Sequence, residues 1–397
     1  MQADIIPLVV GALVFLSSLI SLKLGLSVAI IEILLGAAAG NLGLRPEDWM
    51  IYMASFGGII LTFLAGTEID TRLMREKFKQ TFLIGAFSFL LPFVGVFLYT
   101  YHVAGWSYKA ALIAGTALST TSLAVVYSVL VETGLSKTEI GKLLMASTFV
   151  TEMGTALALS VLFTKPTLYT LIFISISLNV IFFADKISHR VFSNPLLKNK
   201  VIEPEIKYIF LLLLTFMYFA NLGGGHAILP VFLLGLLMSG HFKKTAESRV
   251  IRDRLRTVAY AIVTPIFFIV GGMKISVPFI VSALALFFIL FGLKLGTKFL
   301  GVYFLAKKYV PQGRMYTTLL MSTGLTFGTI SSLFGLNSGF INQVQYSVLV
   351  GVVIASAVFP TFIAQKWFRP VHSEDIVDMD LANGNGRAID NGHRPNP

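Results

Sequence analysis

The sequence predicts an all-α polytopic membrane protein, and three observations support this fold class. The chain has 397 residues, of which 55% are hydrophobic and only 13% charged, and its mean hydropathy is +0.80. Soluble domains carry about 25% charged residues. The apolar residues gather into runs of roughly 20, the length at which a helix crosses a hydrocarbon core. These runs lack the strict alternation of membrane strands, so we expect helices and not a β-barrel.

The apolar runs predict about 13 transmembrane helices, each near the length needed to span a bilayer. Glycine clusters and short connections blur the ends of the second, eighth and ninth. In chain order the predicted spans are Ile5–Leu22, Leu26–Leu42, Trp49–Ile69, Thr81–Tyr101, Ala110–Leu130, Leu143–Phe163, Leu168–Ala184, Tyr208–Leu222, Ala227–Ser239, Val258–Met273, Phe279–Leu305, Tyr316–Leu336 and Tyr346–Ala364.

Basic residues concentrate in four connections, those after spans three, seven, nine and eleven. With thirteen spans, these four connections lie on one side of the membrane. Cytoplasmic loops carry an excess of Lys and Arg, so we expect the N-terminus outside and the C-terminus in the cytoplasm. The same loops account for the net charge of +11, so no nucleic-acid partner is expected. The residues are Arg72, Arg75, Lys77, Lys79, Lys186, Arg190, Lys198, Lys200, Lys207, Lys243, Lys244, Arg249, Arg252, Arg254, Arg256, Lys307, Lys308 and Arg314.

The last part of the chain differs in composition from the rest. Residues 371–397 are polar, rich in Asn, Gly and Asp, and show no apolar period, which predicts a disordered cytoplasmic tail after a transmembrane domain over 1–370. The chain contains no cysteine, which excludes disulfides and thiolate metal sites. No nucleotide-binding glycine motif follows a strand, and no cofactor is expected.

Glu152 is the most informative residue, because it lies inside the sixth predicted span, Leu143–Phe163. A carboxylate in hydrocarbon costs about 2.5–3.5 kcal/mol on insertion scales, so such a group is expected to be neutralised, paired or functional. Its neighbours include the hydroxyl residues Ser147 and Thr151. A membrane carboxylate among hydroxyls is suited to binding one proton or one small cation at a time.

Two spans contain clusters of hydroxyl residues and glycine that favour a break in the helix, because hydroxyl side chains compete for backbone hydrogen bonds. Such residues also serve ordinary packing between membrane helices. Two breaks, one in each half of the chain and both near the span that carries Glu152, are typical of a transporter binding site. The clusters are Ser119, Thr120, Thr121 and Ser122 in span five, and Ser322, Thr323, Gly324 and Thr326 in span twelve.

Lys294, Lys298 and Glu32 are further ionisable residues within predicted spans. Lys294 and Lys298 are four residues apart in Phe279–Leu305, which places them on one helix face. We expect Lys298, and as an alternative Lys294, to act as the charge partner of Glu152 when no ion is bound. Lys294 can instead extend toward the interface. We interpret Glu32, in the second span, as a structural carboxyl.

Four segments resemble motifs of the bacterial and archaeal monovalent cation:proton antiporters, in the second cation:proton antiporter subfamily. Their order and spacing extend the resemblance over almost the whole membrane part of the chain. The segments are Ile31–Gly36 followed by Gly40, Phe63–Glu68, Thr264–Met273 and Lys298–Gly301.

The resemblance implies two inverted repeats with two broken helices that cross. Spans four to six and eleven to thirteen would form a core domain, and spans one to three and eight to ten a dimerisation domain, in a homodimer. Glu152 stands where the family has its ion-binding aspartate, and Thr151 stands where many members have a second Asp, an Asn or a Gln. A single carboxylate favours electroneutral exchange, whereas the membrane lysine is typical of electrogenic members, so the stoichiometry stays open.

We therefore predict a secondary transporter, not an enzyme, that exchanges Na⁺, or K⁺ or Li⁺, for H⁺ by alternating access. Its expected place is the lipid of a prokaryotic plasma membrane, with a role in pH homeostasis. Proton and cation would compete for Glu152, and no metal other than the transported cation is expected. Hard cations prefer oxygen ligands. The remaining oxygen ligands are expected from the backbone at the two breaks, from water, and from Thr151, Ser147, Thr121 and Thr120.

Three alternatives have less support. A sodium-coupled anion symporter of similar fold would need a positive pocket near the breaks, but the predicted site is acidic. A non-transporting ion sensor would need an output domain or a partner surface, and the tail offers neither. An intramembrane hydrolase would need a nucleophile with a base or a pair of aspartates within the spans, and no such arrangement is found.

Overall fold

The computed structural model describes residues 5–24, 27–67, 76–135, 138–163, 168–193, 202–222, 227–244 and 246–370. The predicted disordered tail, 371–397, lies outside the described residues, as does part of the basic connections, including Arg72, Arg75, Lys198 and Lys200. In the described ranges the regular structure is entirely helical, so the predicted all-α fold class is confirmed.

Helices follow one another along the described chain with short connections. They are α1 (Ile6–Leu24), α2 (Val28–Asn41), α3 (Asp48–Thr67), α5 (Phe78–Leu98), η1 (Tyr99–Val103), α6 (Tyr108–Ser119), α7 (Leu123–Glu132), α8 (Glu139–Phe163), α9 (Leu168–Ser193), α10 (Pro204–Leu222), α11 (Ile228–Lys244), α12 (Ala246–Val258), η3 (Ala259–Val263), α13 (Thr264–Met273), α14 (Val277–Ser282), α15 (Leu284–Tyr309), η4 (Pro311–Gly313), α16 (Arg314–Met321), α17 (Thr326–Asn337) and α18 (Gln343–Trp367).

Each of the thirteen predicted spans corresponds to a helix or a helix pair in the structure. Nine helical segments of the described residues are long and apolar enough to cross a membrane. Three shorter apolar helices lie within α2, α9 and α11. The pair α6 and α7 makes the remaining span, because neither half reaches the membrane length alone. The glycine-rich ends that blur spans eight and nine in the sequence fall partly at 223–226, outside the described residues.

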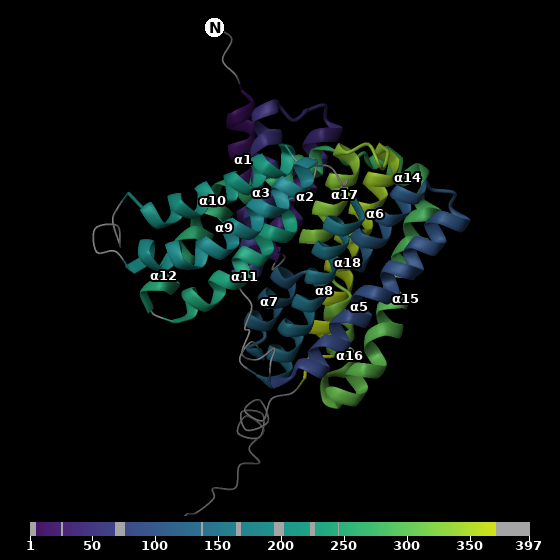
Figure 1. Ribbon diagram of the computed structural model, residues 1–397. Helices are drawn as coiled ribbons and strands as arrows, with labels where there is room; N and C mark the ends of the chain where they lie inside the picture. The colour runs from purple at the N-terminus through teal and green to yellow at the C-terminus, as the bar shows by residue number, and fades with distance from the viewer. Residues whose placement is uncertain are drawn as a thin grey trace, which may run out of the picture.

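The helices pack into two groups, which Figure 1 shows on opposite sides of the molecule. In the first helix group, α2 packs against α13, and α3 packs against α11 and α13. Small residues let these backbones approach closely. A Cβ on Gly36 would lie 2.9 Å from Ile269 Cα, and one on Gly272 would lie 2.9 Å from Ala37 N. We define the first helix group as α1–α3 and α10–α13, with η3.

The second helix group comprises α5–α8 and α15–α18. Here α5 packs against α15, α8 and α6, and α17 packs against α6 and α18 (Figure 1). Asn342 caps the start of α18 with a reciprocal bond pair to Gln345. This group contains the residues predicted to form the site, because Glu152 is on α8 and both hydroxyl clusters lie between its helices.

The two predicted breaks are present, and they cross. Helix α6 ends at Ser119 and α7 begins at Leu123, while α16 ends at Met321 and α17 begins at Thr326. The Ser122 N–H donates to Thr323 O at 3.2 Å, and Thr121 Oγ1 donates to Met321 O at 2.7 Å. Each break therefore satisfies part of the other's backbone, which explains how non-helical chain is accommodated within apolar surroundings.

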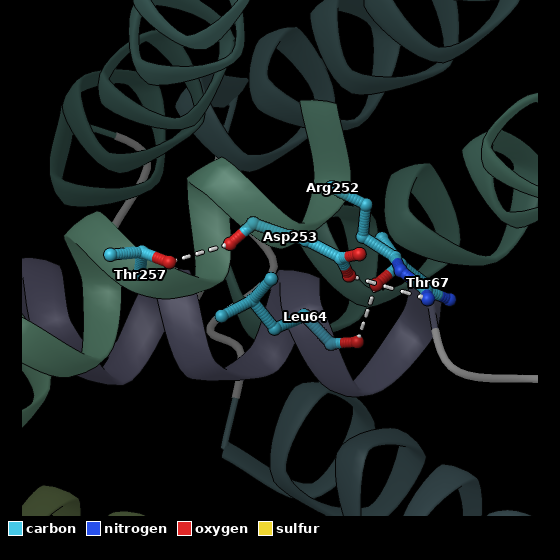
Figure 2. A network of polar contacts seen from close by, with 5 residues as sticks. All are labelled: Leu64, Thr67, Arg252, Asp253 and Thr257. Atoms are coloured by element: carbon cyan, nitrogen blue, oxygen red, sulfur yellow. Dashed lines mark hydrogen bonds and ion pairs between the residues drawn. The ribbon is translucent and has the colours of Figure 1, made fainter. Parts of the chain in front are cut away.

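Helix α12 packs against α10, α11 and η3, and several polar contacts lie along it. Figure 2 draws Arg252, Asp253 and Thr257 of α12 together with Leu64 and Thr67 of α3. Arg252 Nη2 lies 3.5 Å from Asp253 Oδ1, and Thr257 Oγ1 donates to Asp253 O at 3.0 Å. Farther along α12, Arg254 Nη1 lies 2.9 Å from Glu203 Oε1, just before α10. The first two contacts lie within α12, whereas the Arg254–Glu203 pair joins α12 to the segment before α10.

Candidate ion-binding site

Glu152 is buried in the middle of α8, with its side chain 1% exposed. Its Oε1 accepts a hydrogen bond from the Leu123 N–H at 3.0 Å. Leu123 is the first residue of α7, so the carboxylate lies at the N-terminus of a half-helix. The exposed N–H groups and dipole of a helix N-terminus stabilise negative charge. The break at Thr120–Ser122 therefore leaves the Leu123 N–H free of a helical partner, so that it can donate to Glu152.

The second carboxylate oxygen of Glu152, Oε2, differs from Oε1 in its hydrogen bonding. Oε2 is buried and has no hydrogen-bond partner among the described residues. Buried polar atoms nearly always have a partner, so an unpartnered one requires an explanation. Glu152 lines a cavity of about 40 Å³, which is room for at least one water-sized ligand, since roughly 10–15 Å³ suffices for one. One oxygen is thus anchored, and the other is available to take a proton or a cation.

The cavity lies on the boundary between the two helix groups. On the side of the second group it is lined by α7, α8 and α17, and on the side of the first by α3, α12 and η3. We call it the inner cavity, because the basic connections lie toward this end. Its described lining is Leu61, Leu64, Ala65, Leu123, Tyr127, Glu152, Arg256, Tyr260 and Thr326.

Hydroxyl groups from both breaks lie beside this cavity. Thr326, the first residue of α17, lines it, and its Oγ1 lies 3.4 Å from Ser122 Oγ. Of the predicted broken-helix residues, Thr326 thus lines the cavity with Glu152, and Ser122 contacts Thr326. The other hydroxyls of the clusters bond elsewhere. Ser119 Oγ, for instance, donates to Thr116 O at 3.0 Å.

Thr151 and Ser147, predicted as ligands, do not face the inner cavity in this structure. Thr151 Oγ1 donates to Gly85 O and to Ser147 O, both at 3.1 Å. Ser147 Oγ is buried and has no hydrogen-bond partner within the described part of the chain, and Ser147 lies where α8 packs against Gly85 of α5. Neighbouring residues on a helix point about 100° apart, so Thr151 cannot share the direction of Glu152.

Thr121 and Thr120 also have partners other than Glu152. Thr121 Oγ1 accepts a hydrogen bond from Lys298 Nζ at 2.8 Å and itself donates to Met321 O. Thr120 Oγ1 lies 3.5 Å from Thr121 O. These two residues thus contribute to the crossing of the breaks.

The two lysines of α15 are fully buried at the crossing of the breaks. Lys298 Nζ donates to Ser88 Oγ and to Thr121 Oγ1, both at 2.8 Å. Lys294 Nζ has no hydrogen-bond partner among the described residues and lies against Gly324. Neither ammonium lies within ion-pair distance of the Glu152 carboxylate. The expected direct pair is therefore not formed in this conformation, and Lys294 does not extend to the interface.

Glu32 lies in the first helix group, apart from this site. Its side chain is 2% exposed on α2, and Oε2 has no partner among the described residues. Because Gly36 packs against Ile269, Glu32 lies one turn earlier along the contact between α2 and α13. Its structural role stays a prediction.

A second, larger cavity lies on the same boundary at the opposite end. This outer cavity has a volume of about 530 Å³ and is lined by α3, α10, α11, α13 and α17. Its polar lining includes Asp48, Asn221 and Asn337. Its lining also includes Gly58, Phe267 and Ile330. A Cβ on Gly58 would be 3.3 Å from the Phe267 ring and 4.0 Å from Ile330 Cγ1, so these residues pack together as an apolar layer.

Comparison with known proteins identifies the family. Residues 9–368 match the family described as "Sodium/hydrogen exchanger, transmembrane". The chain is 27% identical over 359 residues to a probable Na⁺/H⁺ antiporter 3 of Methanocaldococcus jannaschii, covering 85% of this chain and 90% of that protein. It is 25% identical to the Na⁺/H⁺-K⁺ antiporter GerN of Bacillus cereus, covering 84% and 88%.

The fold agrees with these matches. The structure of the sodium proton antiporter MjNhaP1 from Methanocaldococcus jannaschii at pH 8 superposes with a TM-score of 0.66, at 16% identity, covering 91% of this chain and 98% of that one. The chain therefore belongs to the sodium/hydrogen exchanger family, within the cation:proton antiporter superfamily. It is a multi-pass membrane protein of a family of transporters, as the sequence motifs implied.

Three features of the site were not predicted from the sequence. The first is the Leu123 N–H, a backbone group whose role depends only on where α7 begins. The others are Arg256 and Tyr260, which line the inner cavity from the first helix group. Arg256 was interpreted only as one of many basic loop residues. A basic residue so close to the start of an apolar span was the one signal in the sequence.

Proposed function

We propose that this protein exchanges a monovalent cation, Na⁺ first and K⁺ or Li⁺ as alternatives, for H⁺, with both ions competing for Glu152. The observation that carries the proposal is the unequal use of the two carboxylate oxygens. Oε1 is held by the Leu123 N–H, while Oε2 lies without a partner in a side chain that lines the inner cavity. A proton on Oε2 and a cation bound to it exclude one another.

A cation at this position would find oxygen ligands. Glu152 and Thr326 line the same cavity, Ser122 Oγ lies 3.4 Å from Thr326 Oγ1, and water can complete the shell. Na⁺ and Li⁺ are hard cations that bind oxygen. The names of the relatives, Na⁺/H⁺ antiporters in one case and a Na⁺/H⁺-K⁺ antiporter in another, agree with this class of substrate.

Alternating access would occur by movement of the two helix groups against each other. The second group would be the moving core, and the first would be the scaffold that also forms a homodimer. Both cavities lie on the boundary between the groups, and α3 and α17 contribute to both. A shift of α17 along α3 would close the inner cavity while opening the apolar layer at Gly58, Phe267 and Ile330.

The proposed setting is the plasma membrane of a prokaryote, with the basic connections and the C-terminus in the cytoplasm. Apolar side chains such as Phe182 and Phe304 are exposed on the outside of the helices, where lipid would cover them. In this orientation the inner cavity faces the cytoplasm, and the conformation is one in which Glu152 is approached from that side.

The proposal is tested by purified protein in proteoliposomes that carry a pH-sensitive dye and an imposed pH gradient. Wild-type protein should dissipate the gradient when Na⁺ is added, and a series with K⁺ and Li⁺ reveals the preference. Glu152→Gln should abolish this response, because an amide neither binds a proton nor neutralises a cation. Glu32→Gln, a matched change at a buried carboxyl outside the site, should retain most of it. Full activity of Glu152→Gln would contradict the assignment.

A further inference from the structure

The inner cavity contains a second charged group, which comes from the opposite helix group. Of the described residues that line the cavity, Glu152 and Arg256 carry charge. Arg256 lies in the last turn of α12, and Tyr260 lies in the following turn, η3. A cation that reaches Glu152 from this end passes between a guanidinium on the first helix group and a carboxylate on the second.

Two sets of contacts hold Arg256 in this place. Its guanidinium carbon lies 5.9 Å from the centre of the Tyr127 ring on α7, within the range of a cation–π interaction. Its own helix, α12, packs against α10, α11 and η3, and the ion pair of Arg254 with Glu203 joins it to the segment before α10. The Arg256 guanidinium therefore belongs to the first helix group and contacts α7, the helix whose N-terminus binds Glu152.

The outer cavity has charges of both signs at its lining. Asp48 is part of that lining, and Lys274 Nζ donates to Asn337 Oδ1, also of the lining, at 2.9 Å. Fixed charges act strongly in narrow, poorly solvated cavities, where the effective dielectric constant is well below that of water. A cation approaching Glu152 from the inner end is thus opposed by the Arg256 guanidinium.

We propose that Arg256 determines the apparent cation affinity of the inner-facing state by raising the KM for the cation at the inner end. This inference rests on the exchange function proposed above and assigns to that function a specificity-determining residue. The consequence is a threshold: exchange from the inner end begins only when the cation there is abundant, because the guanidinium opposes its entry.

The test measures the KM for Na⁺ at each face in oriented proteoliposomes. Arg256→Gln should lower the inner-face KM about fivefold to tenfold, a shift of the size expected from one nearby unit charge at intermediate dielectric. The maximal rate and the outer-face KM should change by less than about twofold. Arg256→Lys should behave like the wild type because the charge is kept. Lys142→Gln, which removes an exposed charge from the same end of α8, is the matched control and should have no effect.

A second measurement, made on one variant, separates the effect of the charge at position 256 on the KM from the effect of the side chain's shape. The chain has no cysteine, so Arg256→Cys offers a single thiol. A cationic methanethiosulfonate reagent should restore the high inner-face KM, and a neutral one should leave it low. The inference is overturned if Arg256→Gln keeps the wild-type KM, or if the cationic and neutral reagents act alike. In either case Na⁺-dependent proton movement by the wild type would leave the proposed function intact; its absence would refute that function instead.

Discussion

At the residue scale, the chemistry depends on how a single carboxyl group is held. Glu152 Oε1 is anchored to the first N–H of α7, and Oε2 is the atom on which exchange would occur. An anchored carboxylate keeps its position whether or not a proton or a cation is bound. In the proposed function, this anchoring would allow Glu, which has a longer and more flexible side chain than Asp, to bind the ion at this position.

Thr326 and Thr151 provide a test of which hydroxyl contributes to the site. Thr326→Val should raise the KM for Na⁺ about threefold to tenfold, since losing one hydrogen-bonding oxygen typically costs about 0.5–1.5 kcal/mol. Thr151→Val should change KM little, because Thr151 Oγ1 donates to Gly85 O and Ser147 O and not toward the cavity. Initial rates over a range of Na⁺ concentrations check both. The reverse order of effects would show that Thr151 is the ligand.

The buried lysines belong to the same scale, but they serve the framework of the breaks in this conformation. Lys298 donates to hydroxyls on α5 and at the first break, and Lys294 lies against Gly324 at the second. Two ammonium groups near the C-terminal carbonyls of α6 and α16 complement the negative ends of those half-helices. An ion pair with Glu152 in another conformation stays a prediction.

At the scale of elements, the crossing of the two breaks is the feature that organises the site. The break at Thr120–Ser122 provides the N-terminus that holds Glu152, and the break at Ser322–Leu325 places Thr326 beside it. Neither break is stable alone within apolar surroundings, because its free backbone groups need partners. The bonds from Ser122 N to Thr323 O and from Thr121 Oγ1 to Met321 O supply them.

At Gly324, the two breaks pass so close to each other that there is little room for a side chain. A Cβ there would collide with Lys294 Nζ and lie 3.1 Å from Thr120 O. Gly324→Ala should therefore lower the apparent melting temperature in detergent, with an overpacking cost of about 1–3 kcal/mol, and should reduce exchange. Gly292→Ala on α15 is the matched control, since a Cβ there meets nothing within 4 Å. Equal stability of the two variants would refute the close crossing.

Much of this architecture follows from the sequence for physical reasons. A run of about 20 apolar residues must be a helix in lipid, which is why the thirteen spans could be placed. Glu152 was identifiable because a carboxyl group is costly in hydrocarbon. The breaks were identifiable because Ser, Thr and Gly cluster there.

The rest of the site could not be predicted, because it depends on contacts between distant segments. Almost every residue has a backbone N–H, so the sequence does not single out that of Leu123. It becomes the hydrogen-bond donor to Glu152 only because α6 ends and α7 begins at this point. Arg256 resembles the other basic residues near it until packing places it in the inner cavity. The direction of Thr151 was foreseeable from helical geometry alone, whereas the role of Thr326 required the crossing to be known.

At the scale of the whole molecule, the proposed alternating access makes the two cavities and the apolar layer between them one of two conformations. Glu152 lines the inner cavity, while the lining of the outer cavity includes Gly58, Phe267 and Ile330. Gly58 and Phe267 belong to the first helix group, and Ile330 belongs to the second. Opening the outer route therefore requires relative movement of the groups, and a bond between them should prevent it.

A cross-link across the apolar layer tests that movement. The absence of natural cysteine allows the double variant Gly58→Cys with Ile330→Cys, whose positions are close enough for a short thiol cross-linker. Cross-linking should abolish exchange, and a reducible linker should allow its recovery on addition of reductant. Each single variant, treated in the same way, should keep its activity. Full exchange by the cross-linked protein would exclude alternating access through this boundary.

The most direct measurement of the central claim is cation-induced proton release by the purified protein. In weakly buffered detergent solution with a pH-indicating dye, addition of Na⁺ to the protonated wild type should release protons in an amount that saturates with Na⁺, because the cation displaces the proton from Glu152. Glu152→Gln should release none, and Glu32→Gln should release as much as the wild type. Undiminished release by Glu152→Gln would contradict the claim that proton and cation share this one carboxyl group.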